Sequence, residues 1–299
     1  MAQNSRLSLI ERAAARLDLR SLGDPPVSLV SPVQRDTKPA IPFGDVARSS
    51  AHIRGQTGVT APAPSQPDRR PNSVRFDGAR LREISLVDWE RGRTRVAEEF
   101  RLIKRQLLER PASNPDQGHA RHNVVMITSA LPREGRTFTA LNLAISIAME
   151  PHREVLLVDA CDNENSIASV LPPTVGLGWL DLVTDATLNT ADAALETNIP
   201  GLSVLLSGRR RRHGAELLAS DKMQRLLDEL SCQDPNRIIL IDAPPCLASS
   251  DPSTLARVVG QTVFVVEAHT TQQQNVEAAL EHLRSCSNTY LVLNKCRSH

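Results

Sequence analysis

The sequence predicts an α/β fold in which a doubly wound, mostly parallel sheet carries helices on both faces. Its strand-like runs are continuously apolar rather than alternating, which is typical of strands buried on both faces of a parallel sheet. Helical stretches at 137–149, 216–231 and 272–285 separate them. In such folds ligands bind at the carboxyl ends of the strands, so a site is expected there. The apolar runs are residues 124–128, 154–159, 202–207, 237–242, 262–268 and 289–294.

The first of these strands runs into a loop of the phosphate-binding type. Ala130 is followed by four residues and then by Gly135-Arg136-Thr137, where the motif has G-x-x-x-x-G-K-[ST]. In that motif backbone N–H groups and the helix N-terminus face an anion, and the Lys reaches the β- and γ-phosphates. Arg136 replaces the compact Lys by a planar fork, which is not a conservative exchange. The residues expected to bind a nucleotide phosphate with Mg²⁺ here are Ala130, Arg133, Glu134, Gly135, Arg136, Thr137 and Phe138.

Two aspartates follow apolar runs and complete a candidate catalytic set. Asp159 ends VLLVD and Asp242 ends ILID, and a carboxylate after such a strand is the usual Mg²⁺ partner. Each alone is a weak signal, because a strand-end Asp often caps the next helix. The loop and the two aspartates follow one another in the order expected of βα units, which is a stronger signal than any one of them. The candidate catalytic residues are therefore Asp159, Asp242 and Arg136, and the candidate metal ligands are Thr137 and Asp242. Asn294, at the end of the last strand, is either a contact to an adenine edge or an ordinary turn residue.

The part of the chain before residue 122 has a different organisation. Residues 1–20 are expected to form a short amphipathic helix. Residues 21–79 hold nine of the 20 prolines, which predicts a disordered linker. The helical stretch in 80–121 is either a surface helix with local ion pairs or a contact between copies of the chain through residues 95–108. Residues 122–299 are expected to form the α/β domain.

Composition excludes several function classes. Lys and Arg number 35 against 34 Asp and Glu, and the chain has five Phe, two Trp and one Tyr, so neither a strong basic field nor a base-stacking platform is expected. The four arginines at 209–212 are best explained as a solvated loop. The five cysteines lack metal-site or disulfide spacing. No apolar run of about 18 residues and no signal peptide is present, so we expect a cytoplasmic protein that meets a membrane only through a partner.

Several motifs in order resemble the bacterial tyrosine kinases (BY-kinases) of polysaccharide export. The loop TSALPREGRTFTALNLAISIA resembles TSxxPGEGKTxxxxNLAxxxA, and VLLVDACDNENS resembles VLLVDADxRxPS. The segment ILIDAPPCLASSD resembles VIIDTPPVLxxSD, LSGRRRRHGAELLAS resembles LPAGxxxxxPxELLxS, and EEFRLIKRQL resembles the ring-forming EExRxLRTxL helix. The N-terminal SLIERAAARL with its Pro-rich linker resembles the cytoplasmic, exosortase-associated branch.

This resemblance implies a P-loop NTPase fold, ATP and Mg²⁺ as cofactors, and a separate transmembrane chain-length (co-polymerase) protein as partner. The sequence also departs from the family. Arg133 stands at a Gly position that can require positive φ, Arg136 replaces the Lys, and Cys161 replaces the second Asp of Asp-x-Asp. The only Tyr is Tyr290, inside the last strand, so autophosphorylation of a Tyr-rich tail is not expected.

Three functions are compatible with these residues. The first is a regulatory subunit of exopolysaccharide synthesis and export with weak or lost catalysis. The second is an active Mg·ATP-dependent kinase or ATPase that phosphorylates another protein, with Arg136 on the phosphates and Asp159 activating the acceptor hydroxyl. The third, a partition or cell-division ATPase, is disfavoured because Leu131 and Pro132 stand where that class carries an additional Lys.

Overall fold

The computed structural model describes residues 27–34, 72–78, 86–87, 94–109, 121–161, 166–174, 176–208, 217–218, 220–234 and 236–296. Within these ranges nine strands form one sheet, in the order β1-β9-β8-β3-β7-β4-β6-β5-β2. All neighbouring pairs are parallel except β5 and β6. The strands are β1 (Val27–Gln34), β2 (Ser73–Val74), β3 (Val124–Ser129), β4 (Glu154–Asp159), β5 (Leu195–Thr197), β6 (Leu202–Leu205), β7 (Arg237–Asp242), β8 (Gln261–Glu267) and β9 (Thr289–Cys296).

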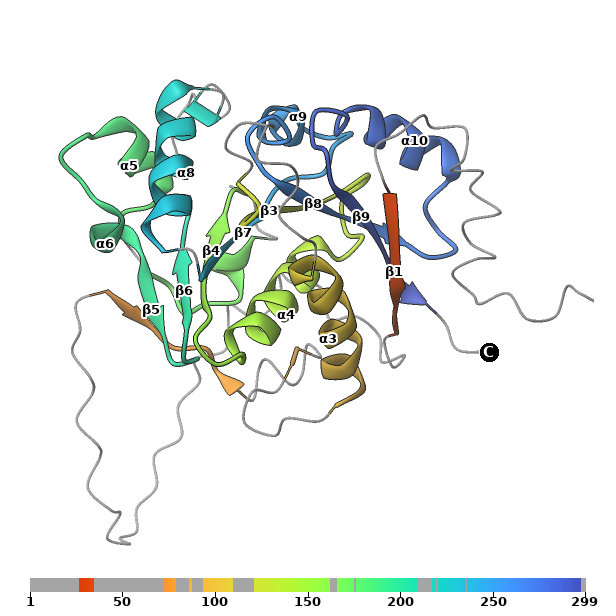
Figure 1. Ribbon diagram of the computed structural model, residues 1–299, viewed down its shortest axis with the longest axis horizontal. Coiled ribbons are helices and arrows are strands. Elements are labelled where there is room, and N and C mark those ends of the chain that lie inside the picture. Colours follow the sequence, from red (N-terminus) through yellow and green to blue (C-terminus); the bar gives the residue numbers. More distant parts are fainter. Residues whose placement is uncertain are drawn as a thin grey trace, which may run out of the picture.

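Helices cover both faces of this sheet (Figure 1). On one face α3 and α4 pack over β3 and its neighbours, and on the other face lie α5, α8, α9 and α10. Each face therefore has its own hydrophobic cluster, which confirms the predicted doubly wound α/β fold. The helices are α3 (Arg95–Leu108), α4 (Arg136–Ala148), α5 (Trp179–Thr184), α6 (Thr190–Ala193), α8 (Asp221–Gln233), α9 (Asp251–Leu255) and α10 (Gln273–Glu281).

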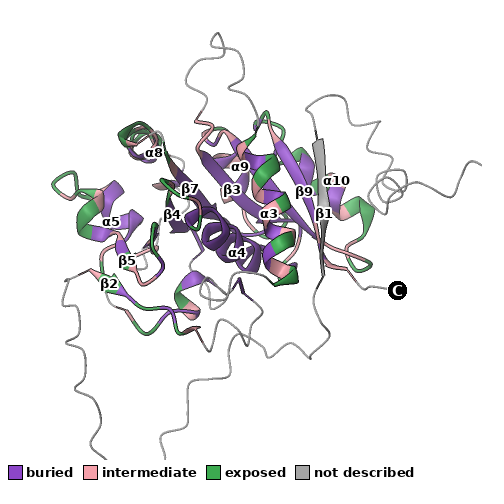
Figure 2. Cartoon of the chain, turned by 60° about the horizontal axis from the view of Figure 1, so that its bottom comes forward, coloured by how far each residue is buried: buried purple, intermediate pink, exposed green. Residues whose placement is uncertain are grey.

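The central strands match the predicted runs closely, because their sequences are apolar on both faces. All six residues of β3 are buried, and so are the last five of β4 and of β7. Within the predicted helical stretch 216–231, residues 217–218 are helical and α8 begins at Asp221, where the Ser220 side chain accepts a hydrogen bond from the Met223 N–H and caps the helix. All 13 residues of α4 are buried, as Figure 2 shows, so α4 is a core helix.

The organisation before residue 122 differs in part from the prediction. The expected helix at 1–20 lies outside the described residues. Within the predicted linker 21–79, however, residues 27–34 form β1, which pairs in parallel with β9, and Ser73–Val74 pairs with β5. The linker prediction therefore does not hold for these two segments. A valine-rich stretch can add to an open sheet edge, and the edge supplies the hydrogen bonds that the isolated segment lacks.

The helix α3 belongs to the core of the domain. Its buried residues Ala97, Phe100, Ile103 and Leu107 join the cluster that α4 lines, and the Phe100 ring meets that of Phe138 edge-on at 6.0 Å between centroids. The predicted units 80–121 and 122–299 thus share one hydrophobic cluster where the structure describes them.

A close approach of two backbones at Gly178 allows a stability prediction. A Cβ at this position would lie 2.1 Å from the Gly208 nitrogen and 2.3 Å from the Leu206 oxygen. Because backbone occupies this space, Gly178→Ala is expected to lower the free energy of unfolding by about 2–3 kcal/mol. The matched control is Gly176→Ala, whose Cβ would meet nothing within 4 Å among the described residues. Urea denaturation of both variants tests this, and equal stabilities would show that the loop relaxes freely.

Candidate functional site

The loop between β3 and α4 has the backbone of a phosphate-binding turn. Gly135, the N-cap of α4, has φ 97°, and Arg133 has φ 69°. The left-handed region costs an L-residue about 1–2 kcal/mol, while glycine occupies it freely. The expectation that position 133 requires positive φ is therefore confirmed, and Arg133 is the residue that bears this cost. The N-terminus of α4 follows this turn directly, and a helix N-terminus can attract an anion.

The Glu134 side chain is buried and stabilises the turn from within. One carboxylate oxygen accepts a hydrogen bond from the Leu131 N–H at 2.7 Å, and the other accepts one from the Thr271 hydroxyl. The Glu134 carbonyl accepts a hydrogen bond from the Asn294 amide at 2.8 Å. Glu134 thus acts through the shape of the loop, since both carboxylate oxygens already accept hydrogen bonds.

The end of β9 holds the loop from the other side. The Asn294 side chain is fully buried, and its amide oxygen accepts a hydrogen bond from the Lys295 N–H. Lys295 donates to the Arg133 carbonyl at 2.8 Å and pairs with Glu267 at 2.7 Å. Asn294 therefore ties β9 to the loop, and its contact with an adenine edge stays a prediction. The sequence analysis assigned no role to Lys295. Its position directly after Asn294, at the end of an apolar strand, was the signal that could have pointed to it.

Three adjacent strands bring the other candidates together. β7 lies between β3 and β4, and Asp242 pairs in register with Ile127 on one side and with Asp159 on the other. Parallel strands present their carboxyl ends at the same sheet edge, so the loop, Asp242 and Asp159 converge there. Three motifs that are separate in the sequence thus meet in space.

Asp242 is the centre of this cluster. It is fully buried, and its Oδ2 accepts a hydrogen bond from the Thr137 hydroxyl at 2.6 Å. The Arg136 guanidinium, also buried, faces the other oxygen, with Nε 3.6 Å from Asp242 Oδ1. Its Nη2 lies 3.5 Å from the Cys161 sulfur. Among the described residues, neither Arg136 Nε nor Asp242 Oδ1 has a hydrogen-bond partner, so they form a close ion pair without a hydrogen bond.

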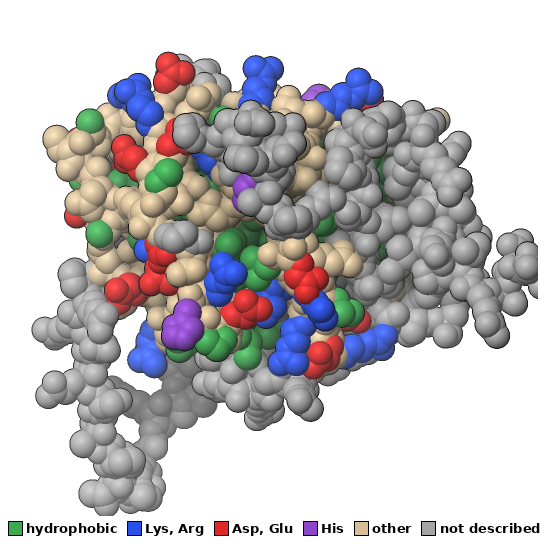
Figure 3. All heavy atoms as spheres, in the orientation of Figure 1, with side chains coloured by type: hydrophobic (Ala, Val, Ile, Leu, Met, Phe, Trp, Pro, Cys, Tyr) green, Lys and Arg blue, Asp and Glu red, His purple; other side chains and the backbone are tan. Residues whose placement is uncertain are grey.

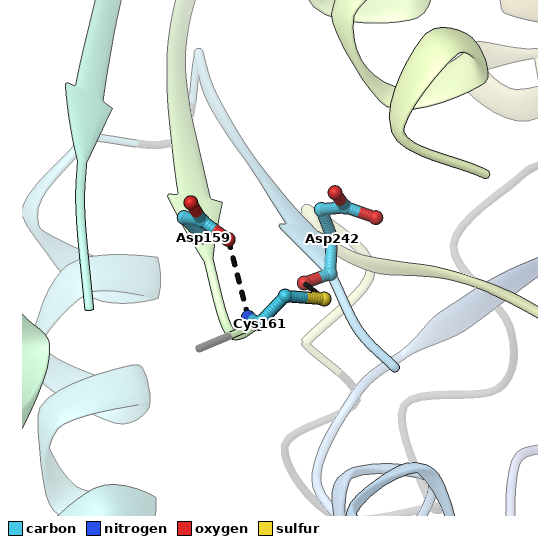
Figure 4. A group of neighbouring side chains, drawn as sticks. All are labelled: Asp159, Cys161 and Asp242. Carbon is cyan, nitrogen blue, oxygen red and sulfur yellow. Dashed lines mark hydrogen bonds between the residues drawn. The ribbon is translucent and has the colours of Figure 1, made fainter. Parts of the chain in front are cut away.

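Asp159 is held in place by the backbone around it. Its two carboxylate oxygens accept hydrogen bonds from the N–H groups of Cys161 and Ala168, each at 3.1 Å. The Trp179 indole donates to the Asp159 carbonyl at 3.0 Å. In Figure 4 the side chains of Asp159, Cys161 and Asp242 gather at the ends of β4 and β7. One ligand atom from each of these three lies within 4.8 Å of the other two.

These donors fit Mg²⁺ only in part. The Thr137 hydroxyl and the Asp242 carboxylate are oxygen ligands of the kind that Mg²⁺ prefers. The Cys161 thiol is a soft ligand that Mg²⁺ does not favour. The Arg136 guanidinium is a cation next to the carboxylate that the metal would use. Sequence reasoning identified all four residues but not the contact between Arg136 and Asp242.

Burial controls the protonation of this cluster. It raises the pKa of Asp159 to about 7, and the negative charge of Asp242 adds to the increase. It also raises the pKa of Asp242 to about 6, against the lowering influence of Arg136 and of the Thr137 hydrogen bond. Burial raises the pKa of the Cys161 thiol as well, so this group stays protonated at neutral pH.

A raised carboxyl pKa predicts how stability depends on pH. The pKa of Asp159 rises from 3.8 to about 7 on folding, so the folded state binds the proton more tightly. The resulting stabilisation is complete below pH about 4 and is lost as pH rises through about 7. Asp159→Asn is neutral at every pH, so its stability relative to wild type should increase between pH 5 and 8, by on the order of 2 kcal/mol.

Urea unfolding in EDTA at pH 5 and 8 measures this difference. Asp185→Asn is the control: hydrogen bonds from Thr187 lower the pKa of the exposed Asp185 carboxyl, so its contribution is constant over this pH range. A difference between Asp159→Asn and wild type that does not change with pH would contradict the assignment.

Phe138 and the arginine run differ from the other candidates. The Phe138 side chain packs against Phe100 in the core, so only its backbone can serve a nucleotide. Residues 209–212 lie outside the described residues. Ala130 is buried, and its carbonyl accepts a hydrogen bond from the Leu247 N–H.

The exposed face of α3 carries charges of both signs, as Figure 3 shows around this helix. Arg101 pairs with Glu98 at 2.6 Å, and Lys104 pairs with Glu150 of the segment after α4 at 2.9 Å. These pairs support the surface-helix explanation of the charge pattern. A contact between copies of the chain through residues 95–108 stays a prediction.

Among the described residues, none of the helices has the length and hydropathy needed to cross a membrane.

Comparison with known proteins places this geometry in one family. No family model matches the sequence. The tyrosine-protein kinase YwqD of Bacillus subtilis is 36% identical over 169 residues, which cover 56% of this chain and 69% of that protein. The tyrosine-protein kinase wzc of Salmonella typhimurium is 30% identical over 161 residues, 54% of this chain but only 22% of that protein.

Solved structures that resemble this chain include kinase domains of the same kind. The VpsO kinase domain is 32% identical with a TM-score of 0.53, and the match covers 58% of this chain and 85% of that domain. The chimerical protein CapA2B2 shares the fold, with a TM-score of 0.61 at 22% identity over 76% of this chain and 94% of its own. Because YwqD is 36% identical and the match covers more than two thirds of its length, the chain belongs to the bacterial tyrosine-protein kinase family.

Proposed function

We propose that this chain is a regulatory member of the family, acting in exopolysaccharide biosynthesis and export with weak or lost phosphotransfer. The contact of Arg136 with Asp242 carries this proposal. In a working loop the basic residue reaches the β- and γ-phosphates. Here the Arg136 guanidinium is instead buried between the Asp242 carboxylate and the Cys161 thiol. To serve a phosphate it must leave Asp242 without its charge partner in a buried site, which is costly.

The remaining groups are suited to bind a nucleotide weakly. The backbone of the loop and the N-terminus of α4 would face the phosphates. The Thr137 hydroxyl and the Asp242 carboxylate would hold Mg²⁺, which would neutralise phosphate charge when bound. Thr137 and Asp242 already lie in contact, at 2.6 Å, so this pair needs little rearrangement.

An active kinase that phosphorylates another protein is the second candidate. It is favoured by Asp159, whose pKa of about 7 suits a general base that accepts the proton of a tyrosine hydroxyl. In that case Arg136 would turn to the phosphates and Asp159 would activate the acceptor. Tyr290 is buried in β9, so we expect that acceptor to belong to another protein.

The cellular setting follows from the resemblance of the motifs. We propose a cytoplasmic protein that a transmembrane chain-length (co-polymerase) protein recruits to the inner face of the membrane. Self-association through residues 95–108 would be the counterpart of the ring helix in the family. Copurification with the co-polymerase protein tests the contact with the membrane partner. Charge-reversal variants at Glu98 and Arg101, compared with wild type, test the self-association.

Calorimetric titration of the purified chain with ATP and ADP, with and without Mg²⁺, tests the proposed function. Millimolar or weaker binding, and no transfer of phosphate to a tyrosine-containing peptide or to the partner, is expected. Micromolar Mg²⁺-dependent binding together with tyrosine phosphorylation would overturn the regulatory proposal in favour of the active kinase. Asp159→Asn is the control that separates true transfer from a contaminating kinase, because it removes the proposed base.

A further inference from the structure

We propose that the Arg136 guanidinium is a built-in cation of this site. It takes the place beside Asp242 that a divalent metal ion would otherwise take, so the nucleotide-free protein does not bind Mg²⁺ or Mn²⁺ there. This inference rests on the proposed function only for the identity of the site. It deepens that function because it gives a physical reason for weak catalysis.

The first support is the division of the Asp242 carboxylate between two partners. Oδ2 accepts a hydrogen bond from the Thr137 hydroxyl, and Oδ1 faces the Arg136 Nε at 3.6 Å. No other group in the described part of the chain satisfies Oδ1, although the side chain is fully buried. A buried carboxylate requires a compensating positive charge, and the guanidinium is the cation that this site provides.

The second support is the charge balance around the three-residue cluster. Asp159 already accepts two backbone hydrogen bonds, and the buried Cys161 thiol donates to the Asp242 carbonyl at 3.5 Å. The Arg136 Nη2 donates toward this sulfur at 3.5 Å. A metal ion would therefore meet one shared carboxylate and a fixed positive charge instead of the two free carboxylates of an Asp-x-Asp site.

Two substitutions act together in this arrangement. Arg is longer than Lys and presents its charge as a planar fork, so it can span from α4 to both Asp242 and Cys161. A second aspartate at position 161 would compete for the same guanidinium and leave negative charge for a metal. With Cys161 in its place, the guanidinium faces the Asp242 carboxylate and a thiol.

A Mn²⁺ titration of the nucleotide-free full chain, followed by electron paramagnetic resonance, tests the proposal. Arg136→Met keeps the aliphatic stem and removes the charge. It should bind Mn²⁺ at least about tenfold more tightly than wild type, since a repelling charge is removed beside the ligand. Its melting temperature should rise with added Mn²⁺, because a ligand that binds the folded state stabilises it, while that of wild type should not change.

Arg237→Met is the matched control. It removes the same charge from the strand that ends in Asp242, but Arg237 lies at the opposite end of β7 and pairs there with Glu154 at 2.9 Å. It should leave Mn²⁺ binding as in wild type. The double variant Arg136→Met/Asp242→Asn should lose the gained binding, which locates the ion at Asp242.

Equal Mn²⁺ affinity of Arg136→Met and wild type would overturn the proposal. If Arg136→Met does not fold, wild type and Asp242→Asn suffice: submillimolar Mn²⁺ binding by wild type that Asp242→Asn abolishes would overturn it as well. Because no nucleotide is present, these results are independent of the phosphotransfer assay. A chain that phosphorylates tyrosine yet binds no Mn²⁺ alone would refute the regulatory function and leave the built-in cation intact.

Discussion

The double variant Arg133→Gly/Arg136→Lys is expected to bind Mg·ATP about tenfold to a hundredfold more tightly than wild type, because a hydrogen bond to a charged group contributes about 1.5–3 kcal/mol. A lysine at position 136 would direct a compact ammonium to the phosphates and release Asp242 for the metal. A glycine at position 133 would occupy φ 69° without strain and let the backbone approach the phosphate. Calorimetry with ATP and Mg²⁺ measures the change.

The control for this variant is Arg237→Lys. Arg237 begins β7, the strand that ends in Asp242, and pairs with Glu154 at 2.9 Å near the surface. The same Arg-to-Lys exchange at the far end of the same strand should leave ATP affinity unchanged. The single variants Arg133→Gly and Arg136→Lys show how much of the gain in ATP affinity comes from the backbone at position 133 and how much from the cation at position 136. No gain in the double variant would mean that the loop is not what limits binding, and Cys161 would become the next position to restore.

Phe100→Ala is expected to lower the free energy of unfolding by about 3–5 kcal/mol. The Phe100 side chain is fully buried between α3 and α4, edge-on to Phe138. Its removal leaves a cavity that the rigid, wholly buried α4 cannot fill. Urea or thermal unfolding measures the loss, which decides whether α3 is part of the folded core.

Leu102→Ala on the same helix is the matched control. Leu102 is 51% exposed, so its truncation should change stability by less than about 0.5 kcal/mol. If the two variants lost equal stability, α3 would be attached through more than its Phe100 face. If Phe100→Ala cost nothing, α3 would be dispensable for the fold and free to act as a separate contact helix.

The sequence determined the parts of this protein that depend on local pattern. Strands β3, β4 and β7 could be located from continuous apolar runs, because a strand buried on both faces tolerates no polar residue except at its end. The loop at 130–137 could be located from Gly135 and Thr137, because a tight turn before a helix needs glycine and the metal needs a hydroxyl. Asp159 and Asp242 could be assigned to one site because parallel strands share a carboxyl edge.

Only the tertiary structure decided what depends on contacts between distant segments. The sequence showed that Arg136 is unusual, but not that its guanidinium lies against Asp242, which is far along the chain. It also did not show that the Asn294 amide donates a hydrogen bond to the Glu134 carbonyl and so ties β9 to the loop. It also did not place residues 27–34 beside β9. A long side chain or an edge strand takes its position from whichever partner the fold brings near, and one sequence carries no local signal for that choice.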